Sequence, residues 1–219
     1  MDEIVKGIED EALLKLNKKR EDYSASPWLD REFVLAVLSG EDIGYFDDYS
    51  ELIPDQFWAD KEFSVQALSR ASMIHDYNLY DEIAERVPEA LWNDWHFVSL
   101  LVRYDSYALE WASAEACSNK FVIEYALQCE EDKDQNYGYI FYHIPKTLWN
   151  DQSFVESYVL YYYDSDSDGD DFDTIVENTP KEFWSEKEFV LEALEKDKRF
   201  EDFVPDDLKK DPDVAQLID

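Results

Sequence analysis

The stretch IPDQFWADKEFSVQAL, residues 53–68, carries the pattern that decides the fold. In it, Pro54 is followed four positions later by Trp58, then by Asp60 and Phe63. Proline suits the first position of a short helical turn. Aspartate before an apolar run is a preferred helix N-cap, because its side-chain oxygen accepts free backbone N–H groups. The stretch therefore predicts a short helical turn that leads into a capped helix.

The same pattern recurs along the whole chain, and aligning it gives seven copies. The phenylalanine position is held by Phe33, Phe63, Phe97, Phe121, Phe154, Phe189 and Val214. The capping position is held by Asp30, Asp60, Asp94, Asp151, Glu186 and Asp211, and by Ser118 in a degenerate fourth copy that lacks both the proline and the tryptophan. After each cap, apolar residues fall at i, i+1, i+4 and i+5, which predicts a helix with one buried face.

A second short amphipathic segment precedes the next proline in several copies, as in LYDEIAERVP, residues 79–88. Each copy therefore predicts a helical hairpin, which must stack on its neighbours to bury its apolar face. We expect an all-α fold of stacked helical hairpins, an α-solenoid-like array of about seven degenerate repeats. Residues 1–22 are expected to form an N-terminal capping helix, and residues 23–219 a single elongated helical-repeat domain.

The copies resemble a bacterial family of short helical repeats of uncharacterised function. The resemblance rests on the helix-opening aspartate followed by phenylalanine and valine, as in WLDREFVLAVL, residues 28–38, and it covers roughly residues 24–219. It implies the helical-repeat architecture and no particular activity.

The charge of the chain is strongly one-sided. Its 219 residues include 53 Asp and Glu against 20 Lys and Arg, a formal net charge of -33. Such a field repels nucleic acids and anionic membranes and attracts basic proteins and cations. We expect no membrane contact, since no apolar run reaches the roughly 18 residues of a membrane span, and we expect a cytoplasmic protein, since the start of the chain lacks the apolar core of a signal peptide.

No motif in the sequence points to a cofactor, a metal centre or catalysis. Asp164, Asp166, Asp168 and Gly169 match the first half of a calcium-binding loop, but Ile175 stands where a bidentate glutamate should close the coordination shell. The three histidines lie in different copies without ligand spacing, and Cys117 and Cys129 form no CxxC pair. We therefore expect neither an enzyme nor a metal site.

The charge density suggests a function. Seven hairpins at an interhelical spacing of about 8–10 Å would make a rod of about 60–70 Å. This corresponds to roughly one net negative charge per 2 Å of rod length, close to the one charge per ~1.7 Å along the axis of duplex DNA.

We therefore expect an acidic DNA mimic that occupies the basic groove of a nucleic-acid-binding protein, such as a nuclease or defence complex. By composition it is similar to phage inhibitors of restriction or CRISPR systems. The alternatives are an immunity or antitoxin protein that blocks a nuclease toxin, and an acidic interaction scaffold. The carboxylates expected to stand in for phosphates are Asp47, Asp48, Glu130, Glu131, Asp132, Asp134, Asp164, Asp166, Asp168, Asp170, Asp171 and Asp173.

Overall fold

The structure is a computed structural model that describes residues 2–23, 25–39, 46, 49–130, 137–163, 165 and 170–218. In these residues every regular element is a helix or a short helical turn, and none is a strand. This confirms the predicted all-helical fold. The chain divides into two compact units, Met1–Trp111 and Ala112–Asp219. The single elongated domain over residues 23–219 stays a prediction.

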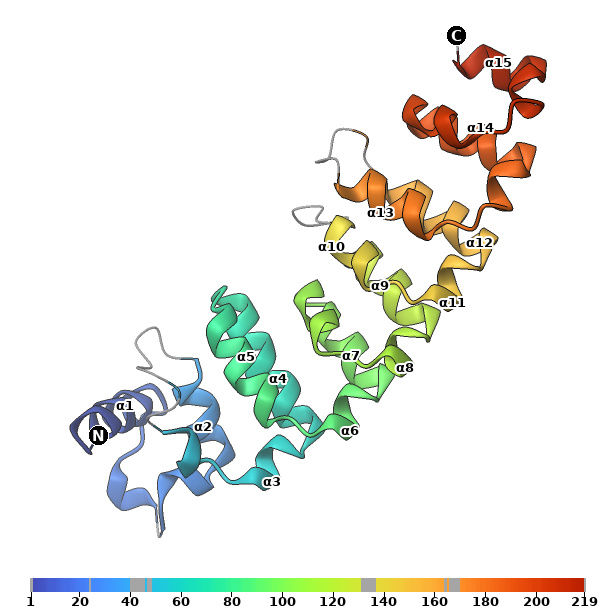
Figure 1. Ribbon diagram of the computed structural model, residues 1–219. Coiled ribbons are helices and arrows are strands. Elements are labelled where there is room, and N and C mark those ends of the chain that lie inside the picture. The colour runs from blue at the N-terminus through green and yellow to red at the C-terminus, as the bar shows by residue number, and fades with distance from the viewer. Residues whose placement is uncertain are drawn as a thin grey trace. The chain divides into compact units, whose positions relative to one another are not determined.

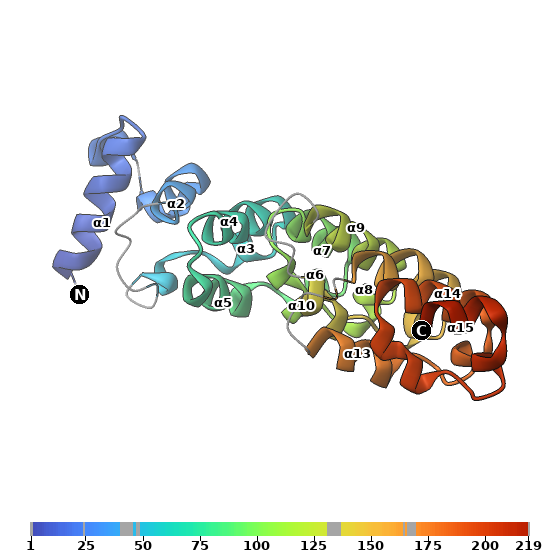
Figure 2. The same ribbon diagram turned by 90° about the horizontal axis from the view of Figure 1, so that it is seen from above.

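The first unit begins with the opening helix expected within residues 1–22. Its described elements are α1 (Asp2–Lys15), η1 (Arg20–Asp22), η2 (Pro27–Leu29), α2 (Arg31–Val37), η4 (Ser50–Leu52), α3 (Asp55–Trp58), α4 (Lys61–Met73), α5 (Tyr77–Arg86), α6 (Glu89–Trp92), α7 (Trp95–Val102) and η5 (Ser106–Glu110). α1 packs against α2 and α2 against α4, while α4 contacts both α5 and α7 (Figures 1 and 2). Ile8, Ala12 and Leu13 anchor α1 in this core.

The second unit repeats the alternation of short and longer helices. Its described elements are α8 (Ala114–Cys117), α9 (Lys120–Glu130), α10 (Tyr137–Tyr142), α11 (Lys146–Trp149), α12 (Gln152–Phe154), the π-helical η6 (Val155–Leu160), α13 (Asp170–Asn178), η7 (Phe183–Ser185), α14 (Lys187–Lys196), η8 (Lys198–Phe203), η9 (Leu208–Lys210) and α15 (Pro212–Ile218). α10 packs between α9 and α13, and α14 contacts η6, η8 and α15.

The predicted helix caps are present in five copies. The carboxylate of Asp60 accepts a hydrogen bond from the backbone N–H of Phe63 at 2.8 Å. Asp30 and Asp151 accept from the same position of their own copies, whereas Asp94 and Asp211 accept from the N–H two residues ahead. Glu186 makes no such bond, so its predicted capping role is wrong. Its longer side chain is not among those preferred at a cap.

The capped turn buries its tryptophan against the phenylalanine that follows. In four copies the two rings meet edge to face with centroids 5.2–5.3 Å apart, a favourable aromatic geometry. These pairs are Trp28 with Phe33, Trp58 with Phe63, Trp92 with Phe97, and Trp184 with Phe189. Hence the tryptophan and phenylalanine rings of these four copies form part of the core.

The fourth copy corrects the predicted register by one residue. Ser118 does not cap α9, because its hydroxyl donates to the carbonyl of Ala114. The side chain of Asn119 instead accepts from the N–H of Phe121 at 3.2 Å. Val122 is therefore the buried residue at the core position, while 46% of Phe121 is exposed.

With this register the fourth copy is complete in geometry. Ser113 takes the place of the proline and its hydroxyl oxygen accepts from the N–H of Ala116 at 3.1 Å. Cys117 takes the place of the tryptophan and is buried. A hydroxyl and a thiol thus replace an imino acid and an indole, which is why the copy is hard to align by residue type.

Candidate partner-binding surface

Most of the acidic residues expected to contact a partner fall outside the described residues. These are Asp47, Asp48, Glu131, Asp132, Asp134, Asp164, Asp166 and Asp168. The partial calcium-loop pattern that begins at Asp164 lies there too.

The expected contact residues that the structure does describe differ in their environments. Glu130 ends α9 with only 5% of its surface exposed, so it is not available as a surface phosphate mimic. Asp170 begins α13. The Asp171 carboxylate lies directly over Gly138 of α10, where no Cβ would fit, and is half-buried. Asp173 is exposed. Packing between α9, α10 and α13 has therefore enclosed part of the expected surface.

Basic side chains in both units link consecutive copies of the capped turn. The residue after one cap reaches the cap of the next copy: Arg31 contacts Asp60 at 3.0 Å, and Lys61 contacts Asp94 at 2.7 Å. In the second unit, Lys187 contacts Asp211 at 2.8 Å and Asp213 at 2.6 Å. We call these contacts the cap ladder.

The cap ladder stabilises the charged form of its carboxylates. The hydrogen bond from Lys61 holds the pKa of Asp94 below its ordinary value. The hydrogen bond from Lys187 does the same for the pKa of Asp211. Several of the chain's scarce cations are thus committed to internal pairs, which leaves the remaining acidic surface with fewer counter-charges.

Removing one ion pair of the cap ladder is expected to lower the stability of the protein. Asp60→Ala deletes both the helix cap and the closer of the two carboxylate partners of Arg31, so we expect a loss of about 1–2 kcal/mol in the free energy of unfolding. Asp60→Asn keeps a capping oxygen and should lose less. The matched control is Asp55→Ala, which removes an exposed partner of Arg86 that caps no helix. Urea unfolding of the three variants checks this, and equal losses for Asp60→Ala and Asp55→Ala would contradict it.

A row of carboxylates on α14 forms no close ion pair in the described part of the chain. Glu188, Glu192 and Glu195 lie at i, i+4 and i+7, on one face of the helix. Glu156 of η6 interacts with Glu192, and Gln152 donates to Glu156 at 2.8 Å. Within the described part of the chain, no Lys or Arg nitrogen lies within 4.0 Å of these four carboxylates. We call Glu156, Glu188, Glu192 and Glu195 the acidic stripe.

Charges of one sign are crowded within the acidic stripe. Partial burial, followed by the repulsion from Glu156 and then Glu195, raises the pKa of Glu192 above its ordinary value, although Lys196 opposes the shift. A site that keeps like charges together sacrifices stability, and such sites are enriched in function. The i, i+4, i+7 spacing of glutamates is present in the sequence KEFVLEALEK, residues 187–196. The prediction of contact residues instead selected the segments that are densest in aspartate.

An exposed aromatic ring lies beside the acidic stripe. The Lys196 ammonium donates to the backbone carbonyl of Tyr161 at 2.9 Å and lies 5.5 Å from the centre of its ring. Tyr161 is 58% exposed. By contrast, Tyr163 is buried, and its hydroxyl donates to Asp197. Tyr161 therefore presents its ring at the surface, whereas Tyr163 belongs to the core.

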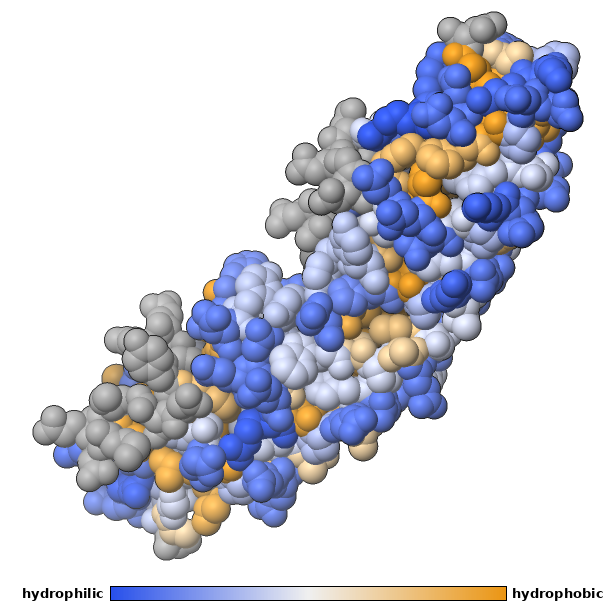
Figure 3. Space-filling view, viewed as in Figure 1, coloured by the Kyte–Doolittle hydropathy of each residue, from blue (hydrophilic) through white to orange (hydrophobic). Residues whose placement is uncertain are grey.

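The wider surface shows no sign of a metal centre or a membrane segment in the part that is described. Hydrophilic side chains cover most of the described face in Figure 3, with apolar patches between them. Among the described residues, no group of three or more His, Cys, Asp or Glu could hold a metal ion. In those same residues, no helix combines the length and apolarity needed to cross a membrane. Burial raises the pKa of the Cys117 thiol to about 11, which disfavours its reactive thiolate.

Comparisons with known proteins add no family to this description. No protein-family model matches the chain, and neither the curated proteins nor the solved structures contain a match. The resemblance to short bacterial helical repeats therefore stays a prediction.

Proposed function

We propose that the protein is an acidic DNA mimic that binds a basic nucleic-acid-binding protein and blocks its groove. The observation that carries the proposal is the acidic stripe, where Glu156 and Glu195 repel Glu192 and no described Lys or Arg forms an ion pair within 4.0 Å of the four carboxylates. A basic groove would neutralise them and relieve their repulsion, so partner binding would recover the free energy that their crowding costs. In this role the protein acts by binding its partner and catalyses no reaction. Its proposed location is the cytoplasm.

The spacing within the acidic stripe suits a groove that accepts a DNA strand. At 1.5 Å of rise per residue, Glu188, Glu192 and Glu195 are separated along α14 by about 6 Å and about 4.5 Å. Successive phosphates of one DNA strand rise by about 3.4 Å. The two carboxylate spacings are thus close to two phosphate steps and one phosphate step. The three carboxylates could therefore contact lysines or arginines that are arranged to bind successive phosphates.

We infer further that the capped turns form an array of about seven degenerate helical repeats. The recurring tryptophan–phenylalanine pairs and the cap ladder support this inference within each unit. Such an array would present acidic side chains at regular intervals, because each copy contributes its helix at a similar spacing. The elongated form of the array is open to measurement by small-angle scattering, where a compact particle would contradict it.

The test is a binding measurement on a partner taken from the source cells. The protein is immobilised, exposed to nuclease-treated lysate, and eluted with increasing salt; a recovered partner is then purified. We expect duplex DNA to compete for that partner, and the affinity to fall by at least about 100-fold between 50 and 200 mM salt. Tight binding that ignores both salt and DNA would contradict mimicry.

Charge-neutral variants connect this binding to the acidic stripe. The triple variant Glu188→Gln, Glu192→Gln and Glu195→Gln should weaken binding by about tenfold or more. The matched control is Glu85→Gln, Glu89→Gln and Glu115→Gln, which changes the net charge equally at exposed positions that are not part of the stripe. It should change the affinity by no more than about twofold. An equal effect of both variants would mean that total charge, and no particular surface, is recognised.

Tyr161 favours a second candidate, an immunity or antitoxin protein that plugs a nuclease active site. Tyrosine is among the residue types enriched in binding hot spots, so an exposed tyrosine ring can anchor a compact interface. In that case Tyr161→Ala alone should cost more affinity than the triple glutamine variant, and binding should persist at high salt. A DNA mimic should show the opposite order.

A further inference from the structure

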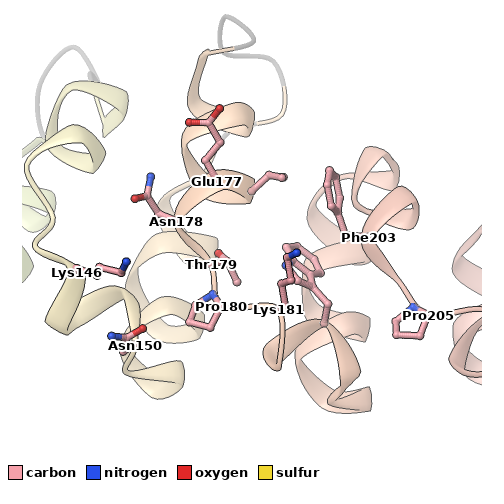
Figure 4. A pocket seen from close by; sticks show the side chains of 11 residues that line it. Lys146, Asn150, Glu177, Asn178, Thr179, Pro180, Lys181, Phe203 and Pro205 are labelled. Atoms are coloured by element: carbon pink, nitrogen blue, oxygen red, sulfur yellow. The ribbon is translucent and has the colours of Figure 1, made fainter.

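A cleft in the second unit has a lining unlike the rest of this acidic chain. Its volume is about 610 Å³, and it lies among α11, the end of α13, η7 and η8. Two lysines, Lys146 and Lys181, border it together with Asn150, and the rings of Trp184 and Phe203 form an apolar wall. In Figure 4 the Glu177 carboxylate, also in the lining, points away from Lys146 and Lys181. The cleft falls in the size range of small-molecule sites.

Both lysines reverse the charge that other copies carry at the same position. The residue after the repeat proline is Asp55, Glu89 or Asp206 in three copies. In the two copies that border the cleft it is Lys146 or Lys181. An acidic residue is favoured there because it lies at the start of a helical turn, so lysine is the locally unfavourable choice. Neither lysine forms an ion pair with any described residue, and the two exchanges converge on one cleft.

Thr179, which also lines the cleft, is a third departure from the repeat pattern. In the other four copies that contain the repeat proline, the residue before it is a buried aliphatic residue. These residues are Ile53, Val87, Ile144 and Val204. Thr179 is equally buried, with 5% exposed, but its hydroxyl has no hydrogen-bond partner. A threonine has nearly the shape of valine, so the exchange alters chemistry more than packing. An unpaired buried hydroxyl costs stability, and a hydrogen-bonding ligand atom would remove that cost.

We propose that this cleft binds a small aromatic oxyanion, a carboxylate or phosphate attached to a ring. The ammonium groups of Lys146 and Lys181 pair with the oxyanion, and the amide of Asn150 and the hydroxyl of Thr179 are available to orient it by hydrogen bonds. The ring packs on Trp184 and Phe203. Three departures from the repeat pattern thus serve one ligand, and each is locally unfavourable without it.

The test uses the full chain labelled with ¹⁵N and titrated with phenyl phosphate, phenylacetate and benzyl alcohol. We expect saturable shifts of the backbone signals of residues 146–150 and 177–181 with at least one of the two anions, at a Kd of about 1 mM or tighter. Comparing the anions distinguishes a phosphate site from a carboxylate site. Benzyl alcohol should bind at least about fivefold more weakly. Equal binding of the alcohol, or no saturable shift with either anion, would overturn the proposal.

Variants separate the cleft from general charge effects. Lys146→Glu and Lys181→Glu restore the charge of other copies and should each weaken anion binding by about fivefold or more. Lys6→Glu is the matched control at an exposed position of α1, and no change in Kd is expected. Thr179→Val restores the aliphatic residue of other copies, so the protein should be at least as stable and bind the anion more weakly. Unchanged anion binding in Lys146→Glu would contradict the proposed site. Unchanged anion binding in Thr179→Val would show that the Thr179 hydroxyl does not contact the anion.

Discussion

Replacing Phe63 with alanine is expected to lower the free energy of unfolding by about 3–5 kcal/mol. The ring is fully buried, meets Trp58 edge to face with centroids 5.2 Å apart, and lies under the guanidinium of Arg31. Its loss leaves a cavity in the middle of a capped turn, and the surrounding helices cannot close it without moving the cap. Urea unfolding followed by tryptophan fluorescence and circular dichroism measures the effect.

The fourth copy provides the matched control. Phe121→Ala removes the same side chain from a position that is 46% exposed, where the ring stacks on Tyr125, so we expect a loss below about 1 kcal/mol. Val122→Ala removes a smaller but fully buried side chain and should cost about 1–3 kcal/mol. If Phe121→Ala proved more costly than Val122→Ala, the one-residue correction of the register would be wrong.

The second large effect concerns pH, and it has two opposite parts. The pKa of Glu192 is raised, first by partial desolvation and then by repulsion from Glu156, so its charged form destabilises the fold above that pKa and protonation as pH falls from 7 should raise stability. The net charge of -33 acts in the same direction, because protonation weakens self-repulsion. Asp94 and Asp211 act oppositely: their lowered pKa values contribute stability above the unfolded-state pKa, and this is lost as pH falls through the folded-state values.

We therefore expect stability to rise on acidification to a maximum near roughly pH 5 and to fall below roughly pH 4. Denaturant unfolding at a series of pH values measures this curve. Glu192→Gln should flatten its rise between pH 7 and pH 5, and Asp94→Asn should flatten its fall at lower pH. Added salt should stabilise the protein at pH 7, since it screens the self-repulsion. A stability that declines steadily from pH 7 downward would contradict the dominant role of crowded carboxylates.

The sequence by itself determined the parts of this protein that depend on neighbouring residues. The helical class and the aspartate caps such as Asp60 arise within about ten residues, so residue type and spacing predict them. The excess of acidic residues likewise follows from composition. The sequence also favoured a partner-binding function over catalysis, although the contact residues it singled out lay mostly in aspartate-rich stretches.

Only the tertiary structure decided what depends on residues far apart in the chain. The approach of Glu156 to Glu192 joins positions 36 residues apart, and Lys61 reaches Asp94 across 33. The enclosure of Glu130, the corrected place of Phe121, and the meeting of Lys146 with Lys181 at one cleft are of the same kind. Whether a carboxylate is buried, paired or crowded is set by how successive helices pack, because burial and Coulomb energy depend on distance in space and not on distance along the chain.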